Sequence, residues 1–273
     1  MSWLLDQSYI SYLNLDHRAD RLEHIQKELE KAGIEATRTR GKRPAEFDLT
    51  EQRLQVMKNR TPGAIGCYMG QIEIIEEAQR RGQHAMVLED DCMFCYDFKE
   101  RVAYIENFLI GKEWDIIWLG ATFHVNPPWW YTGSNPDMPS MPSEYFNTDS
   151  LGIRRDAECT EDPRIIRTYA CFCTYAYVVN HKSIQKALKM LEDLMPASMG
   201  IDWSMIVMQP SLKTYSFVPG CIRQIDNMSD IGNGMTVFSG FAMLGPYWYA
   251  DKMNDFDPAA FNWAEAKNNG QLL

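Results

Sequence analysis

The sequence lacks a long apolar run. A membrane-spanning helix requires about 20 predominantly apolar residues, whereas the longest candidate, residues 171–179, is shorter and contains Thr and Tyr. The first residues have no basic start, and Asp6 interrupts their apolar stretch. We therefore expect neither a transmembrane segment nor a secretory signal.

Three familiar sequence motifs are also missing. The chain contains no Gly-x-Gly-x-x-Gly, no P-loop and no Gly-x-Ser-x-Gly. Dinucleotide-dependent dehydrogenases, P-loop ATPases and serine hydrolases of the α/β class depend on these motifs. None of these three classes is favoured.

Basic residues are fewer than acidic residues. Lys and Arg number 27 against 37 Asp and Glu, which gives a formal net charge of −10. An acidic surface repels phosphate backbones and anionic lipid, so nucleic acid and membranes are disfavoured as partners. The remaining composition, 45% hydrophobic and 23% charged, is that of a globular protein. We expect one domain over residues 1–273 and make no prediction of the oligomeric state.

The seven cysteines are odd in number and come without an export signal, so we expect reduced thiols and a cytoplasmic protein. Cys92-x-x-Cys95 suggests zinc or redox chemistry, but zinc requires two further ligands at comparable spacing. Cys171-x-Cys173 is a poor second pair. Buried free thiols are the favoured interpretation.

Strand and helix patterns alternate along the chain. Apolar spacing predicts helices over 19–32, 61–82, 99–109 and 182–194, with a short one at 48–57. Strands are expected near residues 9–15, 34–39, 85–88, 114–119, 168–179 and 213–218. This order predicts an α/β fold with a mostly parallel, Rossmann-type sheet and helices on both faces.

Segment 120–165 shows no periodicity and contains six prolines. Its aromatic residues, among them Trp129, Trp130 and Tyr131, argue against plain disorder. We expect a long irregular loop that orders over a ligand, in which the aromatic rings either stack on a sugar or belong to the core. The C-terminal part is expected to be irregular covering structure.

Three carboxylates, Glu89, Asp90 and Asp91, directly follow the strand at 85–88. Ligands of open α/β sheets bind beyond the carboxyl ends of strands. Crowded carboxylates repel one another, and Mg²⁺ or Mn²⁺ would relieve this repulsion while sharing the phosphates of a nucleotide diphosphate. The alternative is a solvated acidic turn.

Basic residues follow the first two strands. Arg18 and Arg21 come after Asn14, and Arg38 heads a second cluster with Arg40, Lys42 and Arg43. Guanidinium groups match phosphate oxygens well. These side chains are either diphosphate ligands or exposed surface charge.

Five segments in order resemble glycosyltransferase family 25, which includes bacterial lipooligosaccharide galactosyltransferases and collagen hydroxylysine galactosyltransferases. Together they cover roughly residues 8–231. They are YISYLNLDHRADRLEHIQKELEKAGI, PGAIGCYMGQIEIIEEAQRRGQHAMVLEDDCMF with its EDD motif, WDIIWLG, YAYVVN followed by a helix and Ile201-Asp202-Trp203, and Gln224 with Ser229-Asp230-Ile231.

The resemblance implies a GT-A-like glycosyltransferase that uses Mn²⁺ or Mg²⁺. It would move a hexose, galactose or glucose, from a UDP-sugar to a glycan or other hydroxyl acceptor, with inversion. Residues 1–120 would form the nucleotide-sugar-binding half and 121–273 the acceptor half. The implied metal ligands are Asp91, Glu89 and Asp230. The implied donor-binding residues are Asn14, Leu15, Arg18, Arg21, Arg38, Glu89, Asp90 and Gln224.

Asp202 is the implied catalytic base, because it matches the late Asp of the family and inversion requires one base. The alternative for Asp202 is a helix N-cap. Asp226 and Asp230 are either late metal ligands or turn formers. His124 either contacts the diphosphate or the metal, or has no role in the site.

The chain departs from the family pattern at three places. It has Gly70-Gln71 where the family usually has Ser-His, Ala64 where an acidic residue is frequent, and an unusual segment at 40–48. A non-catalytic nucleotide-sugar or glycan-binding protein of the same fold therefore stays open. A metal-dependent nucleotidyltransferase or hydrolase that uses the same carboxylates is a weaker alternative.

Overall fold

The computed structural model describes residues 2–47, 61–123, 158–162, 164–169, 171–195, 200–217, 220–225, 227–231 and 234–236. Its helices are α1 (Trp3–Asp6), α2 (Ala19–Ala32), η1 (Pro44–Glu46), α4 (Pro62–Arg81), α5 (Phe98–Leu109), α6 (Ile184–Leu194), α7 (Ile201–Met208) and η4 (Gln209–Ser211). Its strands are β1 (Ser8–Asn14), β2 (Thr37–Arg40), β3 (His84–Glu89), β4 (Cys92–Phe94), β5 (Ile116–Phe123), β6 (Glu158–Cys159), β7 (Ile165–Arg167), β8 (Cys171–Val179), β9 (Thr214–Phe217), β10 (Ile222–Gln224), β11 (Asn227–Ser229) and β12 (Gly234–Thr236).

The main sheet has eight strands in the order β2-β1-β3-β8-β5-β9-β7-β6. Strand β1 runs parallel to β2 and β3, and β5 runs parallel to β9. Strand β8 lies antiparallel between β3 and β5, and β7 is antiparallel to β9. The predicted α/β fold is confirmed. The sheet is mixed, because β8 runs antiparallel to both of its neighbours and β7 runs antiparallel to β9.

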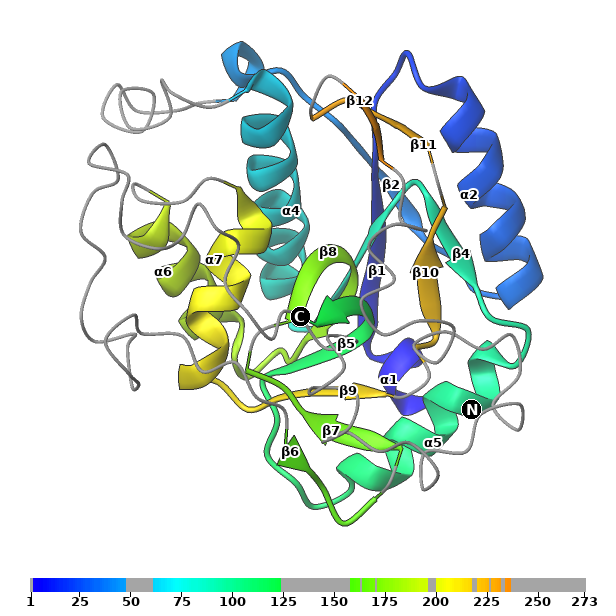
Figure 1. The fold of residues 1–273 in the computed structure, drawn as a ribbon, viewed down its shortest axis with the longest axis vertical. Coiled ribbons are helices and arrows are strands. Elements are labelled where there is room, and N and C mark those ends of the chain that lie inside the picture. The colour runs from blue at the N-terminus through cyan, green and yellow to red at the C-terminus, as the bar shows by residue number, and fades with distance from the viewer. Residues whose placement is uncertain are drawn as a thin grey trace, which may run out of the picture.

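Helices cover both faces of the sheet, as predicted (Figure 1). Side chains alternate along the strands, so Tyr9, Val87 and Trp118 join the core under α4, α6 and α7. Met86 and Ile117, on the other face, join the core under α1, α2 and α5. The continuous apolar strands therefore contribute side chains to two hydrophobic cores, one on each face of the sheet.

The helix ends follow the sequence signals. Thr61 is the N-cap of α4 and its side chain accepts a hydrogen bond from Ala64 N. Gly33 and Gly82 end α2 and α4 with φ of 62° and 67°, the left-handed region that glycine adopts at low cost. The cysteines Cys92, Cys95, Cys171, Cys173 and Cys221 are buried and free, and Cys67 is half-buried, as the thiol interpretation predicted.

The described residues of the C-terminal part include short strands, whereas residues 237–273 of the expected covering structure lie outside the described part of the chain. Residues 222–236 contain the short strands β10, β11 and β12, and β10 pairs antiparallel with β4. A Cβ at Gly120 would clash with the backbone oxygen of Ile222, so glycine is required where β10 crosses β5. Strands of three residues are too short to show a periodic pattern.

Several sequence expectations lie outside the described residues: the helix at 48–57, most of the loop at 120–165 with His124 and Trp129-Trp130-Tyr131, and Asp226. None of the described helices is both long enough and apolar enough to cross a membrane.

Candidate active site at the carboxyl ends of β1 and β3

The acidic triplet is buried, not a solvated turn. Glu89 is the last residue of β3, and Asp90 and Asp91 form the turn into β4. Asp90 and Asp91 are only 6% and 3% exposed. Burying carboxylates costs free energy unless cations or hydrogen-bond donors stabilise them. The contacts of each carboxylate therefore show how its charge is stabilised and where a partner is missing.

Asn14 and Arg21 stabilise Asp90. The Asn14 Nδ2 donates to Asp90 Oδ2 over 2.7 Å. The Arg21 Nη1 lies 3.0 Å from Asp90 Oδ1 and 3.1 Å from Asp91 Oδ2. One guanidinium, placed by the first turn of α2, thus serves two neighbouring carboxylates.

Asp91 is only partly satisfied. Its Oδ2 accepts from Gln224 Nε2 over 2.9 Å, and its backbone oxygen accepts from Ile225 N. Its buried Oδ1 has no hydrogen-bond partner among the described residues. Burial raises the pKa of Asp91, while Arg21 and Gln224 act in the opposite direction. A buried carboxylate oxygen without a donor marks a place for a cation or a donor group.

Glu89 sits in a different environment. Its Oε1 accepts from Gln71 Nε2 over 3.1 Å, and the Cys67 thiol lies 3.8 Å away. Burial and the nearby charges of Asp91 and Asp202 raise the pKa of Glu89 well above its ordinary value. Burial and the neighbouring acids therefore disfavour the ionised form of Glu89.

Asp202 faces the sheet from the first turn of α7. Its Oδ1 accepts from Thr174 N over 2.8 Å and from Thr174 Oγ1 over 2.7 Å. Gly200, and not Asp202, is the N-cap residue of α7. The N-cap interpretation of Asp202 is therefore wrong, and its carboxylate lies near enough to Glu89 to shift the pKa of that group.

Asp230 contacts Arg18 and His17. Arg18 Nη1 donates to its Oδ2, and His17 Nε2 lies 3.1 Å from its Oδ1. Burial alone would raise the pKa of Asp230, but the hydrogen bonds from Arg18 and His17 lower it overall. Thr61 Oγ1 also donates to Ile231 O over 2.8 Å. The 230–231 turn thus closes over the starts of α2 and α4.

Arg38 braces Asn14 from β2. Its Nε donates to Asn14 Oδ1 over 2.9 Å, and its Nη2 donates to Asp16 Oδ1 over 2.7 Å. Leu15 packs its side chain against Gly41, where a Cβ would clash with it.

The predicted residues thus fall into three groups. The first contains Asn14, Arg21, Arg38, Asp90, Asp91 and Gln224, which contact one another in a chain. The second contains Glu89 and Asp202, and the third Arg18 and Asp230. The predicted metal set of Asp91, Glu89 and Asp230 spans all three. Over the described part of the chain, no three His, Cys, Asp or Glu side chains are grouped as metal ligands, so the metal assignment stays a prediction.

Sequence reasoning missed the buried polar residues beneath the acids. Gln71 is 0% exposed and Thr174 is 2% exposed, and both contact the site. Gln71 breaks the apolar stripe of α4, and Thr174 interrupts the apolar strand β8. A polar residue on a buried face was the available signal.

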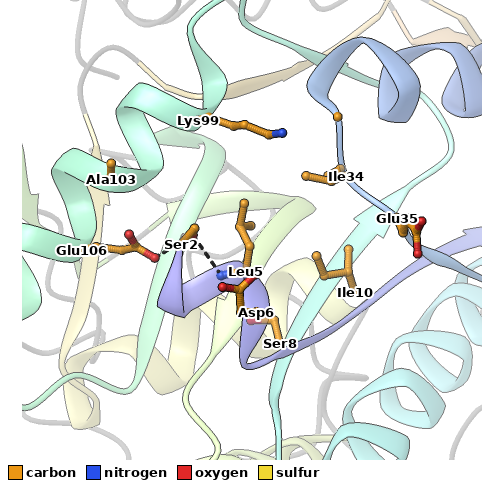
Figure 2. A pocket seen from close by; sticks show the side chains of 11 residues that line it. Ser2, Leu5, Asp6, Ser8, Ile10, Ile34, Glu35, Lys99, Ala103 and Glu106 are labelled. Atoms are coloured by element: carbon orange, nitrogen blue, oxygen red, sulfur yellow. Dashed lines mark hydrogen bonds between the residues drawn. The ribbon is translucent and has the colours of Figure 1, made fainter.

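A cavity of about 580 Å³ lies elsewhere (Figure 2). It is formed by α1, α5, the start of β1 and the end of α2, so it lies at the opposite end of β1 from Asn14. Its buried acid Glu106 accepts from Ser2 Oγ and Leu4 N, both over 2.6 Å, which fixes α1 on α5. The cavity therefore does not belong to the acidic site.

Comparison with known proteins decides the family. The model of glycosyltransferase family 25, described as an LPS biosynthesis protein family, matches residues 7–205. The chain belongs to glycosyltransferase family 25. The matched range includes Asn14, the acidic triplet and Asp202, but not Gln224 and Asp230.

One relative in family 25 is the mouse (Mus musculus) protein named inactive glycosyltransferase 25 family member 3. It is 40% identical to this chain over 70 residues, which are 24% of this chain and 12% of the relative. The chain thus matches only a small part of that relative's length, and the word inactive describes the mouse protein. Family 25 as a whole is a family of glycosyltransferases.

Proposed function

We propose that this protein transfers a hexose, galactose or glucose, from a UDP-sugar to a hydroxyl acceptor with inversion, and that it depends on Mn²⁺ or Mg²⁺. The observation that carries the proposal is the unpartnered, buried Oδ1 of Asp91 at the carboxyl end of β3. It lies in a site with both surplus acids and arginines, and that combination suits a cation bound together with a diphosphate.

The donor set fits a hard divalent cation. Asp91 supplies the oxygen without a donor. Burial and the neighbouring acids raise the pKa of Glu89, and a bound cation would favour its ionised form, so Glu89 fits as a further ligand. Asp230 fits less well, since Arg18 already pairs with it and His17 contacts it. When bound, the cation would stabilise negative charge on the leaving diphosphate.

The chain's own residues have separate tasks in this proposal. Arg21 holds Asp90 and Asp91 in place, and Asn14 ties Asp90 to the end of β1. Arg18, the N-cap residue of α2, forms ion pairs with Asp20 and Asp230. Asp202 accepts the proton of the acceptor hydroxyl, since an inverting transfer requires one base within hydrogen-bond reach.

A non-catalytic nucleotide-sugar or glycan-binding protein is the second candidate. Two observations favour it: a relative in the family carries the name inactive, and Gln71 stands where the family usually has His. The first candidate releases UDP from a nucleotide sugar, whereas the second binds a nucleotide sugar or a glycan without releasing UDP.

The test is UDP release. The full chain is incubated with Mn²⁺ and a panel of UDP-sugars, with and without hydroxyl acceptors, and free UDP is measured. We expect release from UDP-galactose or UDP-glucose that a chelator abolishes. Binding of the UDP-sugar without release would favour the non-catalytic candidate, and release that survives the chelator would contradict the metal assignment.

A further inference from the structure

A directed chain of hydrogen bonds runs beneath the acidic site. The Tyr177 hydroxyl donates to Gln71 Oε1 over 2.8 Å. Gln71 Nε2 donates to Glu89 Oε1 over 3.1 Å and to Thr174 Oγ1 over 3.2 Å. Thr174 Oγ1 in turn donates to Asp202 Oδ1 over 2.7 Å.

The direction of this chain is fixed by its ends. The Thr174 hydroxyl has one proton, which it donates to Asp202 Oδ1, so its oxygen accepts from Gln71. The Gln71 amide therefore points its nitrogen toward Thr174 and Glu89, and its oxygen toward Tyr177. Every member has a partner, which is the condition under which a buried polar network fixes one geometry.

This chain of hydrogen bonds joins elements that are far apart in the sequence. Gln71 lies on α4, Thr174 and Tyr177 on β8, Glu89 at the end of β3 and Asp202 on α7. Helices α4 and α7 cover the same face of the sheet (Figure 1). This chain of hydrogen bonds, called the bridge below, thus connects Glu89 on the donor side with Asp202 on the other side of β8.

We propose that Thr174 is a positioning residue whose hydroxyl, itself held by Gln71, orients the carboxylate of Asp202 for proton transfer. This inference rests on the proposed glycosyltransferase function. Thr174 touches no reacting atom, and it acts through Asp202 alone. Glutamine suits this position because its neutral amide has both a donor end and an acceptor end. The donor end meets Glu89 and Thr174, and the acceptor end meets Tyr177.

Three variants separate positioning from folding. Thr174→Val removes the hydroxyl at nearly constant volume and keeps the backbone bond to Asp202. Thr174→Ser restores the hydroxyl. Thr168→Val is the matched control, because Thr168 is equally buried and bonds Thr214 Oγ1 over 3.0 Å away from the acids.

The readout is UDP release with Mn²⁺ and a UDP-sugar, with kcat and the KM for the donor determined separately. We expect Thr174→Val to lower kcat by about ten- to one-hundred-fold, since small misplacements of catalytic groups have effects of that size. Its KM should stay within about twofold, because Gln71 keeps its hydrogen bonds to Glu89 and Tyr177. Thr174→Ser should recover most of the rate, and Thr168→Val should keep it while losing a similar amount of thermal stability.

Equal kcat in Thr174→Val and Thr168→Val would overturn the positioning role. If Thr174→Val does not fold, Gln71→Met decides: it leaves Thr174 in place but removes its donor, and an unchanged kcat overturns the bridge. If the wild type itself releases no UDP from any donor, the proposed function fails and the inference fails with it. That outcome differs from a failure of the bridge alone, in which the wild type is active.

Discussion

The amide of Asn14, at the end of β1, donates to the carboxylate of Asp90 over 2.7 Å, although 76 positions separate the two residues. The other end of the same amide accepts from Arg38 Nε over 2.9 Å. One neutral side chain therefore links a cation on β2 to an acid beyond β3, and it fixes the ends of three adjacent strands.

Replacing Asn14 by Asp tests this link. The carboxylate cannot donate to Asp90 and would face it with like charge, so we expect a loss of about 1–3 kcal/mol in the free energy of unfolding at pH 7. The loss should shrink in acid, where carboxylates are protonated. Urea unfolding of Asn14→Asp beside Gln26→Glu, an exposed control on α2, measures it. Equal stability of the two variants would contradict a structural role for the Asn14 amide.

Arg21 stabilises two buried acids at once. The side chain is 11% exposed, and those of Asp90 and Asp91 are 8% and 4% exposed. Removing one partner of a buried ion pair typically costs about 3–5 kcal/mol, because the remaining charge stays buried. We expect that cost for Arg21→Met in urea unfolding.

The matched control for Arg21→Met is Arg80→Met. Arg80 pairs with Glu77 on the surface with a side chain that is 72% exposed, and exposed pairs contribute at most about 1 kcal/mol. If Arg21→Met proved as harmless as the control, the acids would be stabilised by something other than this guanidinium.

The carboxyl-end location of the site was predictable, whereas its internal pairing was not. A continuous apolar strand followed by Glu89-Asp90-Asp91 places acids at a strand end in any open α/β sheet. Whether Arg21 binds these acids or a ligand depends on the angle between α2 and the sheet, which no local pattern contains. Asp230 shows the same limit, since its partner Arg18 lies 212 positions away.

The sheet order had a similar limit. Helices α2 and α4 were predictable because their apolar stripes and capping residues are local. The insertion of β8 between β3 and β5 is not, because strand direction and neighbours are set by long-range packing. Gln71 and Thr174 were overlooked for a related reason: their partners appear only once α4, β3, β8 and α7 meet.

His84 predicts a dependence of stability on pH. Burial, His181 and Lys182 lower the pKa of His84 to about 4, and its Nδ1 accepts from the backbone N–H of His181 over 3.0 Å. The pKa is lower in the folded state than in the unfolded state, so the unfolded chain binds more protons between about pH 6.5 and 4. This contribution to stability is complete above pH 6.5 and is lost as the pH falls toward 4.

His84→Gln isolates this effect, because the amide oxygen accepts the same bond without titrating. We expect the wild type to lose about 1 kcal/mol more than His84→Gln between pH 7.5 and pH 5 in urea unfolding. His24→Gln serves as the control, because it makes the same substitution at a half-buried histidine on α2. Parallel pH profiles of the wild type and His84→Gln would contradict a neutral, buried imidazole.

Asp202→Asn tests the proposed base. The amide oxygen still accepts from Thr174, so the fold and the donor affinity should survive, but the side chain no longer takes a proton. We expect turnover to fall by about 10²–10⁴-fold, the usual contribution of a general base. Asp6→Asn, at the other end of the sheet, is the matched control. Near-normal turnover in Asp202→Asn would remove Asp202 from the catalytic group.

The central claim is that the acids beyond β3 bind a cation together with the diphosphate of a nucleotide sugar. Calorimetric titration of UDP into the full chain, with and without Mn²⁺, tests it most directly, with Asp91→Asn as the variant and Asp6→Asn as the control. Asp91→Asn retains an acceptor for Gln224 and removes a buried charge, whose burial outweighs its pairing with Arg21, so its melting temperature without metal should hold or rise. We predict Mn²⁺-dependent UDP binding by the wild type and the control, and a loss of at least about tenfold in affinity in Asp91→Asn, on the order of 1.4 kcal/mol or more. Undiminished Mn²⁺-dependent binding of UDP by Asp91→Asn would contradict the claim.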